Sequence, residues 1–166
     1  MRTIVHASTP AELEQAAALL REYADSPDYD ATFAESLAIQ DFARELAELP
    51  GAYAPPAGRL LLALVDGEPA GCAALKALDA VDVCEMKRLY VRPAFRSLGL
   101  GRALVEALIE EARAAGYCAM RLDTLPEMRA AQRLYRSLGF YEIPPYSEQS
   151  VAGALFFERR LDAAPG

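Results

Sequence analysis

The chain has 166 residues, of which 53% are hydrophobic and 25% charged, and its 17 basic and 24 acidic side chains give a net charge of −7. This length favours one domain over residues 1–166, and the negative charge argues against general nucleic-acid binding, which depends on neutralising phosphates. No apolar run approaches the ~20 residues of a membrane-spanning helix. The N-terminus becomes polar too early for a secretory signal, so we expect a cytoplasmic protein without membrane contact.

The first predicted elements are a strand at Arg2–His6 and helices at Pro10–Ala24 and Thr32–Leu49. Thr9-Pro-Ala-Glu12 is a capping box with proline at the first helical position, which predicts where the first helix begins. Apolar residues recur at helical spacing in both helical segments. The proline- and glycine-containing residues 50–58 form a connecting loop.

Three apolar segments joined by short turns come next: Arg59–Val65, Pro69–Leu78 and Val81–Val91. Consecutive strands with short turns predict an antiparallel meander. A helix at Leu100–Ala115 and a strand at Tyr117–Asp123 complete a βαβ unit with the third strand. Because such crossovers are right-handed and join parallel strands, we expect a mixed sheet.

The last segments are a helix that starts from a second capping box, Thr124-Leu-Pro-Glu127, and runs to Leu138, and strands at Phe140–Ile143 and Gly153–Leu161. We expect residues 162–166 to fray. The order βααβββαβαββ predicts an α+β domain whose mixed, mostly antiparallel sheet has about seven strands and about four flanking helices.

Residues 84–102 join a strand, a glycine turn and a helix start, an arrangement that can bind an anion through backbone N–H groups. Five basic and no acidic residues lie between Met86 and Arg102, whereas eight acidic residues and only Arg44 lie between Glu22 and Glu48. Each charged run fits either a solvated face or a binding role. The three cysteines and the lone His6 lack the spacing of a metal site, and no metal is expected.

The sequence of this segment does not match either of two common nucleotide-binding motifs. Gly99-Leu-Gly101 lacks the third glycine of a dinucleotide fingerprint, and no Gly-Lys-Ser/Thr follows. Arg96-Ser-Leu-Gly99-Leu-Gly101 instead resembles the acetyl-CoA-binding motif Arg/Gln-x-x-Gly-x-Gly/Ala of the GNAT family of N-acetyltransferases. The stretch from Ala131 to Phe140 resembles that family's second motif, Ala-x-x-x-Tyr-x-x-x-Gly-Phe, and the resemblance covers about residues 59–161.

The resemblance implies the family's acyl-CoA N-acyltransferase fold and acetyl-CoA as acetyl donor. In that family the central strand offers backbone groups to the pantetheine arm, and the turn with its arginines holds the pyrophosphate. The residues expected at the cofactor are Leu89, Tyr90, Val91, Arg96, Ser97, Leu98, Gly99, Leu100, Gly101 and Arg102. One position departs from the pattern: Met128 stands where the family often has an asparagine that bonds the arm.

The resemblance also suggests two catalytic residues. Glu85, in the central strand, matches a family position that can hold a general base, although a carboxylate paired with Lys87 or an arginine fits the same position. Tyr135 matches the family's usual proton donor to the departing thiolate, and its spacing to Leu134 and Leu138 fits a core aromatic as well.

The expected function is direct acetyl transfer from acetyl-CoA to an amine, since no cysteine–histidine pair supports a covalent route. An acyl-CoA-binding module without chemistry, acting as a sensor or interaction partner, is the alternative. Acidic residues of the first two helices, including Glu22, Asp28, Asp30 and Glu35, favour a cationic small molecule or peptide as acceptor. A homodimer through the C-terminal strands is common in such folds.

Overall fold

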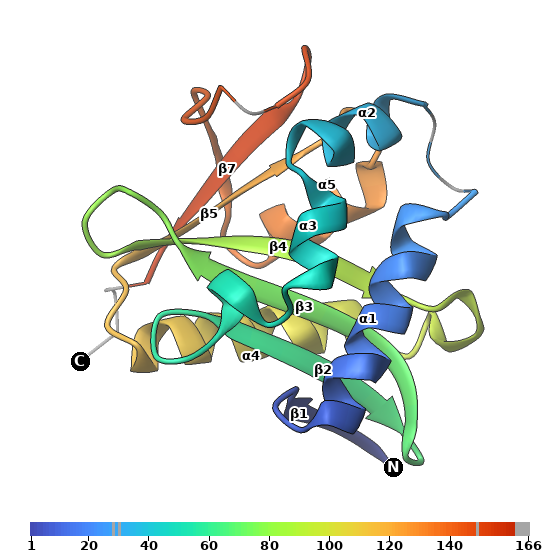
Figure 1. Cartoon of the computed structure of the whole chain (residues 1–166). Coiled ribbons are helices and arrows are strands. Elements are labelled where there is room, and N and C mark those ends of the chain that lie inside the picture. Colours follow the sequence, from blue (N-terminus) through green and yellow to red (C-terminus); the bar gives the residue numbers. More distant parts are fainter. Residues whose placement is uncertain (28, 30, 149, 162–166) are drawn as a thin grey trace.

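The computed structural model describes residues 1–27, 29, 31–148 and 150–161. Within these ranges, seven strands form one sheet in the order β1-β2-β3-β4-β5-β7-β6 (Figure 1). Of the strand pairs that these described residues form, only β4 with β5 is parallel, so the expected mixed, mostly antiparallel sheet is confirmed. The strands are β1 (Arg2–His6), β2 (Arg59–Val65), β3 (Glu68–Ala77), β4 (Val83–Val91), β5 (Ala119–Thr124), β6 (Tyr141–Ile143) and β7 (Leu155–Arg160).

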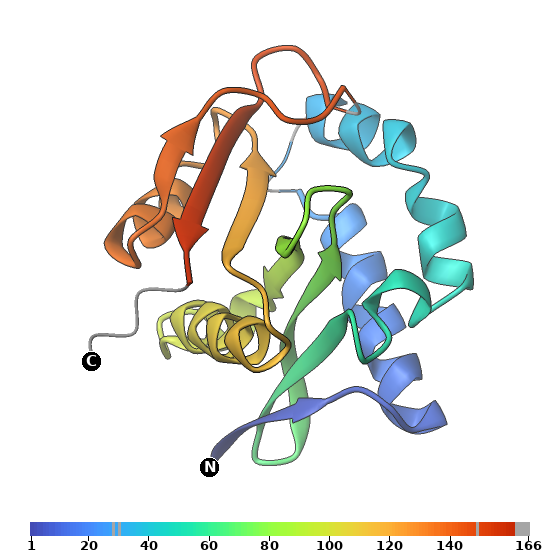
Figure 2. The same cartoon turned by 90° about the vertical axis from the view of Figure 1, so that its left-hand side faces the viewer.

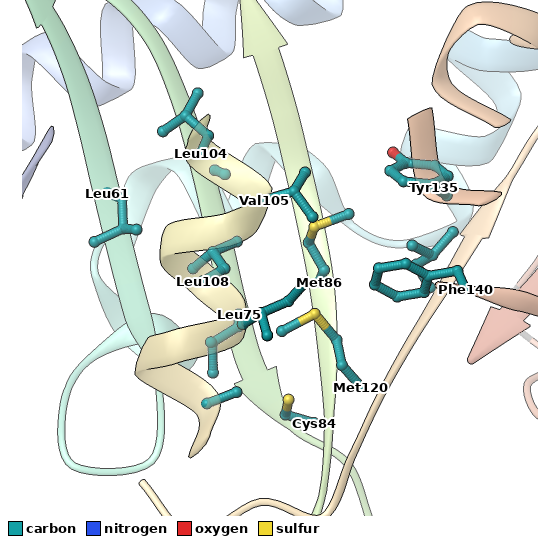
Figure 3. Close-up of a cluster of buried hydrophobic side chains, with 14 of the residues drawn as sticks. Leu61, Leu75, Cys84, Met86, Leu104, Val105, Leu108, Met120, Tyr135 and Phe140 are labelled. Carbon is teal, nitrogen blue, oxygen red and sulfur yellow. The ribbon is translucent and has the colours of Figure 1, made fainter. Parts of the chain in front are cut away.

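The part of the chain that the structure describes has five α-helices, which cover the two faces of this sheet (Figure 2). The buried residues of one face pack under α4 and α5, and those of the other face pack under α1, α2 and α3. The helices are α1 (Pro10–Ala24), α2 (Ala31–Ile39), α3 (Phe42–Ala47), α4 (Leu100–Ala114) and α5 (Arg129–Ser137). Figure 3 shows the first of these cores, in which Leu104, Val105 and Leu108 of α4 meet Met86 and Met120 of the sheet.

The capping box at the start of α1 is confirmed. The hydroxyl of Thr9 accepts a bond from the Glu12 backbone N–H at 3.1 Å, and the Glu12 carboxylate accepts one from the Thr9 N–H at 3.0 Å. These reciprocal bonds satisfy donors that a helix N-terminus otherwise leaves open. Helix α1 therefore has the bounds that the sequence predicts.

The single helix expected at Thr32–Leu49 is wrong, because the segment forms two helices. Asp41 separates them in the left-handed conformation with φ of 54°, which aspartate adopts more readily than most residues. The break lets Phe42 enter the core and brings Glu45 of α3 to β4. The apolar stripe alone could not predict this turn, since it continues through the break.

The second predicted capping box is also wrong. Thr124 is the last residue of β5 and pairs with Leu155 of β7, and α5 begins five residues later at Arg129. Its hydroxyl lies 3.5 Å from the sulfur of Met128, which occupies the helix N-cap without a side-chain cap bond. Strand pairing has thus prevailed over the local helix signal. The strands expected to begin at Val81, Tyr117 and Gly153 begin two residues later than predicted, and the expected fraying of 162–166 concerns residues outside the described part of the chain.

Candidate active site

The turn between β4 and α4 has the backbone that its glycines suggest. A short 3-10 helix, Pro93–Phe95, leads into it, and Ser97 and Gly99 both have positive φ, 74° and 77°. Gly99 is the N-cap of α4, whose first N–H groups have no acceptor within the helix. The positive end of the helix dipole adds to these donors. This arrangement suits an anion, as predicted.

A groove of about 600 Å³, here called the turn groove, runs between this turn and the start of α5. All residues expected at the cofactor line it except Leu98, whose carbonyl instead accepts a hydrogen bond from Arg2. The wall from α5 includes Met128, Ala131 and Leu134. An added Cβ at Gly101 would lie 3.7 Å from the Leu134 side chain and would occupy space at this wall. The turn groove therefore brings the predicted cofactor residues together.

The two arginines of the turn already have partners. Arg102 donates to the hydroxyl of Ser137 on α5 at 2.7 Å, and Arg96 donates to the carbonyl of Val91 at 3.1 Å. Both side chains also line the turn groove, so these bonds hold the guanidinium groups beside it. A bound phosphate would gain charge-assisted bonds from groups that are already near it.

Beyond the turn groove, β4 and β5 separate. Their parallel pairing covers only Val83–Glu85 with Ala119–Arg121. On its other edge β4 contains a bulge, where Arg88 and Leu89 lie opposite Ala73 and Arg88 has φ of 64°. A bulge bends a strand and re-aims its side chains, and it accompanies the opening between β4 and β5.

Two further cavities continue from the turn groove through this opening. The central cavity, about 90 Å³, shares Tyr29, Leu89, Met128 and Ala131 with the turn groove. The polar cavity, about 380 Å³, shares Gln40, Lys87, Arg88 and Asp123 with the central cavity. The three spaces are thus neighbours, and the central cavity shares four lining residues with each of the other two.

Tyr135 lines the central cavity and is also part of the core. Its ring lies 5.8 Å from that of Phe140 and 6.4 Å from that of Phe157, and Figure 3 shows it beside Phe140. Burial raises the pKa of its hydroxyl above the ordinary value for tyrosine. The group therefore keeps its proton near neutral pH, as a proton donor must.

Glu85 lies in the polar cavity and does not reach the central one. Its carboxylate is buried and accepts a bond from the Tyr146 hydroxyl at 2.7 Å. The ammonium groups of Lys87 and Lys76 lie 3.6 and 3.9 Å from its other oxygen. Burial lowers the pKa of Lys87, and the Glu85 charge opposes that shift. The pairing of Glu85 with Lys87 that the sequence left open is present.

Sequence reasoning missed several polar residues on this side of the opening. Arg88 is buried at the bulge and forms two bonds with Glu45, at 2.8 and 2.9 Å. Asp123 lines both the central and the polar cavity, and burial raises the pKa of its carboxyl. Asp123 ends a predicted strand parallel to β4, and ligands gather beyond such strand ends, which was the available signal. Nothing in the sequence pointed to Tyr146.

Within the described ranges, no helix is both long and apolar enough to cross a bilayer. The same residues contain no cluster of three or more histidine, cysteine and acidic side chains that could hold a metal ion.

Comparison with known proteins agrees with the geometry of the site. The model of the acetyltransferase (GNAT) family matches residues 14–140. An uncharacterized N-acetyltransferase of Schizosaccharomyces pombe is 37% identical over 153 residues, which cover 92% of this chain and 90% of the relative. An IAA acetyltransferase of Azospirillum brasilense is 37% identical over 65% of this chain and 71% of its own length.

Solved structures share the fold. The PaiA N-acetyltransferase of Thermoplasma acidophilum, crystallised with coenzyme A, superposes with a TM-score of 0.74 at 18% identity, covering 96% of this chain and 99% of its own. The family model and the two motifs at the turn groove agree, and the chain belongs to the acetyltransferase (GNAT) family.

Proposed function

We propose that the protein transfers the acetyl group of acetyl-CoA directly to an amine. The observation that carries this proposal is that the turn groove and the central cavity share four lining residues where β4 and β5 have separated. A donor bound in the groove and an acceptor entering from the α1–α3 face would meet there. Bringing two reactants together in one orientation supplies a large part of such catalysis.

Acetyl-CoA fits the residues of the turn groove. The glycine backbone of the turn and the first N–H groups of α4 would hold the pyrophosphate, with Arg96 and Arg102 beside it. Backbone groups of Leu89, Tyr90 and Val91 would hold the pantetheine arm. Met128 offers only van der Waals contact and a weak sulfur acceptor where an amide would bond the arm. The donor supplies the activated thioester, and the chain supplies position and proton transfer.

We assign Tyr135 the role of proton donor to the departing thiolate, because its hydroxyl stays protonated and its ring lines the central cavity. Tyr135→Phe is expected to lower kcat by about 100-fold, the lower end for general acid catalysis, with coenzyme A binding unchanged. Tyr141→Phe, which removes an exposed hydroxyl bonded to Glu158, is the matched control. Steady-state kinetics would contradict the role if both variants turned over like the wild type.

A catalytically silent acyl-CoA-binding module is the competing function, and Met128 at the groove is the feature that favours it. A thiol-release assay with acetyl-CoA and a panel of amines separates the two. We expect release of free coenzyme A with at least one amine, together with thermal stabilisation by coenzyme A alone. Stabilisation without release across cationic, neutral and anionic amines would establish the module instead.

The amines tested as acceptors should include both cationic and anionic compounds. The acidic run suggested a cationic acceptor, but Glu22 pairs with Arg92 at 2.6 Å and Glu45 pairs with Arg88, which neutralises part of that run. A cationic amine, a cytoplasmic location and a homodimer through the C-terminal strands stay predictions. Rates with polyamines, amino acids and peptide N-termini, measured side by side, would decide the charge preference.

A further inference from the structure

Asp123 lies on β5 at the point where this strand has separated from β4, on the face of the sheet that borders the polar cavity. Side chains of a strand alternate between faces, so Met120 and Leu122 enter the core under α4 whereas Arg121 and Asp123 lie on the opposite face. Glu85 and Lys87 of β4 line the polar cavity on that same face. The pairing of β4 with β5 ends at Glu85 and Arg121, so Asp123 lies past the last pair, where the strands have opened.

The cations around Asp123 are held by other carboxylates. Lys87 lies 3.6 Å from Glu85, and Arg88 bonds Glu45 through its Nε and Nη2. Among residues 1–27, 29, 31–148 and 150–161, no other side chain forms an ion pair or hydrogen bond with the Asp123 carboxylate, which accepts a bond from its own backbone N–H. Burial raises the pKa of that carboxyl, Lys87 and Arg88 oppose the shift, and Glu85 adds to it. Asp123 is partly buried, and a partly buried carboxylate without a side-chain partner is uncommon unless it serves a ligand.

Gln40 of the same wall presents a second open acceptor. Its amide nitrogen donates to Ser36 at 3.0 Å, while its buried Oε1 has no hydrogen-bond partner within the described part of the chain. Gln40 and Asp123 both line the central and the polar cavity. The unpaired Gln40 oxygen and a carboxylate without a side-chain partner suit an ammonium group, which has several N–H donors and no acceptor.

We propose that Asp123 is the catalytic carboxylate that takes the proton from the acceptor's ammonium group. This inference rests on the proposed acetyl transfer and names its base. The carboxylate removes one proton from the ammonium, and the neutral nitrogen then attacks the thioester carbonyl. A C–N bond forms, the C–S bond breaks, and the thiolate takes the proton of Tyr135. The amide nitrogen loses its second proton to water, and both side chains return to their starting states by exchange with solvent.

Glu85 has a different role in this scheme. Its carboxylate binds Tyr146 and the two lysines, so it holds the wall of the polar cavity and pairs with the ammonium group of Lys87. Glu85 is then a positioning residue. Replacing it should alter acceptor KM more than the pH dependence of the reaction.

The test compares Asp123→Asn, Glu85→Gln and Asp82→Asn, with acetyl-CoA and the amine that gives the fastest thiol release. Asp82 lies in an exposed turn before β4 with φ of 57°, which asparagine also adopts, so its variant controls for loss of a carboxylate. Asp123→Asn is expected to lower kcat/KM at least about 100-fold. Glu85→Gln is expected to raise KM, and Asp82→Asn to match the wild type.

The pH profile gives the decisive readout. Wild-type kcat/KM should fall at acidic pH as Asp123 becomes protonated, through a pKa above the ordinary carboxyl value. The charged and titratable groups facing it are Glu85, Lys87 and Arg88 from β4, Tyr23 from α1, Tyr135 from α5 and Tyr146 from the loop before β7. Glu85→Gln should keep this acidic limb, and Asp123→Asn should lose it.

Stability provides a control for folding. The folded protein holds the Asp123 proton more tightly than the unfolded chain does, so the resulting stability exists at acidic pH and is lost as pH rises through the raised pKa. At pH 7 the Asn variant should therefore melt at or above the wild-type temperature and still be stabilised by coenzyme A. A folded Asn variant that keeps wild-type rate and its acidic limb would overturn the inference. A wild-type protein that releases no thiol with any amine would overturn the proposed function itself.

Discussion

Glu45→Ala is expected to destabilise the protein by about 3–5 kcal/mol, because it leaves the buried guanidinium of Arg88 without its counter-charge. The Arg88 side chain is only 3% exposed, and Glu45 bonds both its Nε and its Nη2. The guanidinium carbon also lies 5.0 Å from the centroid of the Phe42 ring, so the group cannot turn toward solvent without losing this cation–π contact. Equilibrium urea denaturation would measure the loss.

A second ion pair on α3 supplies the matched control. Glu48 bonds Arg44 one turn away at 3.1 Å, but both side chains are more than half exposed. Exposed pairs of this spacing contribute about 0.3–0.5 kcal/mol, so Glu48→Ala should change stability little. The double variant Glu45→Ala/Arg88→Met should recover part of the loss, since it removes the uncompensated charge. Equal effects of the Glu45 and Glu48 changes would show that the Arg88 pair is not a structural support of the bulge.

The boundaries of the helices and strands show what the sequence could and could not predict about the fold. Local signals placed most elements: the Thr9 capping box located α1, and the Gly99 turn located the start of α4. They failed at Asp41 and Thr124, where tertiary contacts prevailed over a local pattern. Asp41 turns the chain so that Phe42 is buried, and Thr124 completes a strand ladder with β7.

The candidate site also has a part that the sequence predicts, the turn groove, and a part that it does not, the acceptor side. Apart from Tyr29, the residues of the turn groove lie in two short stretches of the chain, 89–102 and 127–134, and each stretch overlaps one of the two motifs. The acceptor side is assembled from distant segments, because Arg88 lies 43 residues from Glu45 and Tyr146 lies 61 from Glu85. Pairings at such separations leave no periodic signal in one sequence. The environment of Glu85 and the open carboxylate of Asp123 therefore required the fold.

Gly101→Val is expected to weaken coenzyme A binding by about 100-fold or more. The first turn of α4 lines the turn groove, and a side chain at Gly101 would occupy the space through which its backbone N–H groups meet the pyrophosphate. Bonds to a charged group contribute about 1.5–3 kcal/mol each, and losing even two accounts for the expected change. Isothermal titration calorimetry with coenzyme A would measure it.

A substitution at Gly101 can test coenzyme A binding without disturbing the fold, whereas a substitution at Gly99 cannot. Gly99 has φ of 77°, so any side chain there strains the backbone and would lower stability and binding together. The backbone of Gly101 is helical, an added Cβ meets only an ordinary contact, and valine has a higher helix propensity than glycine. Gly101→Val should thus keep the wild-type melting temperature without ligand. Ala103→Val, in the same helical turn but outside the groove, should leave coenzyme A binding unchanged and lower the melting temperature slightly, since valine forms helix less readily than alanine. If a folded Gly101→Val protein bound coenzyme A as tightly as the wild type, the cofactor would not bind in the turn groove. That result would also contradict the proposed acetyl transfer at the opening between β4 and β5, because the donor would not be bound beside it.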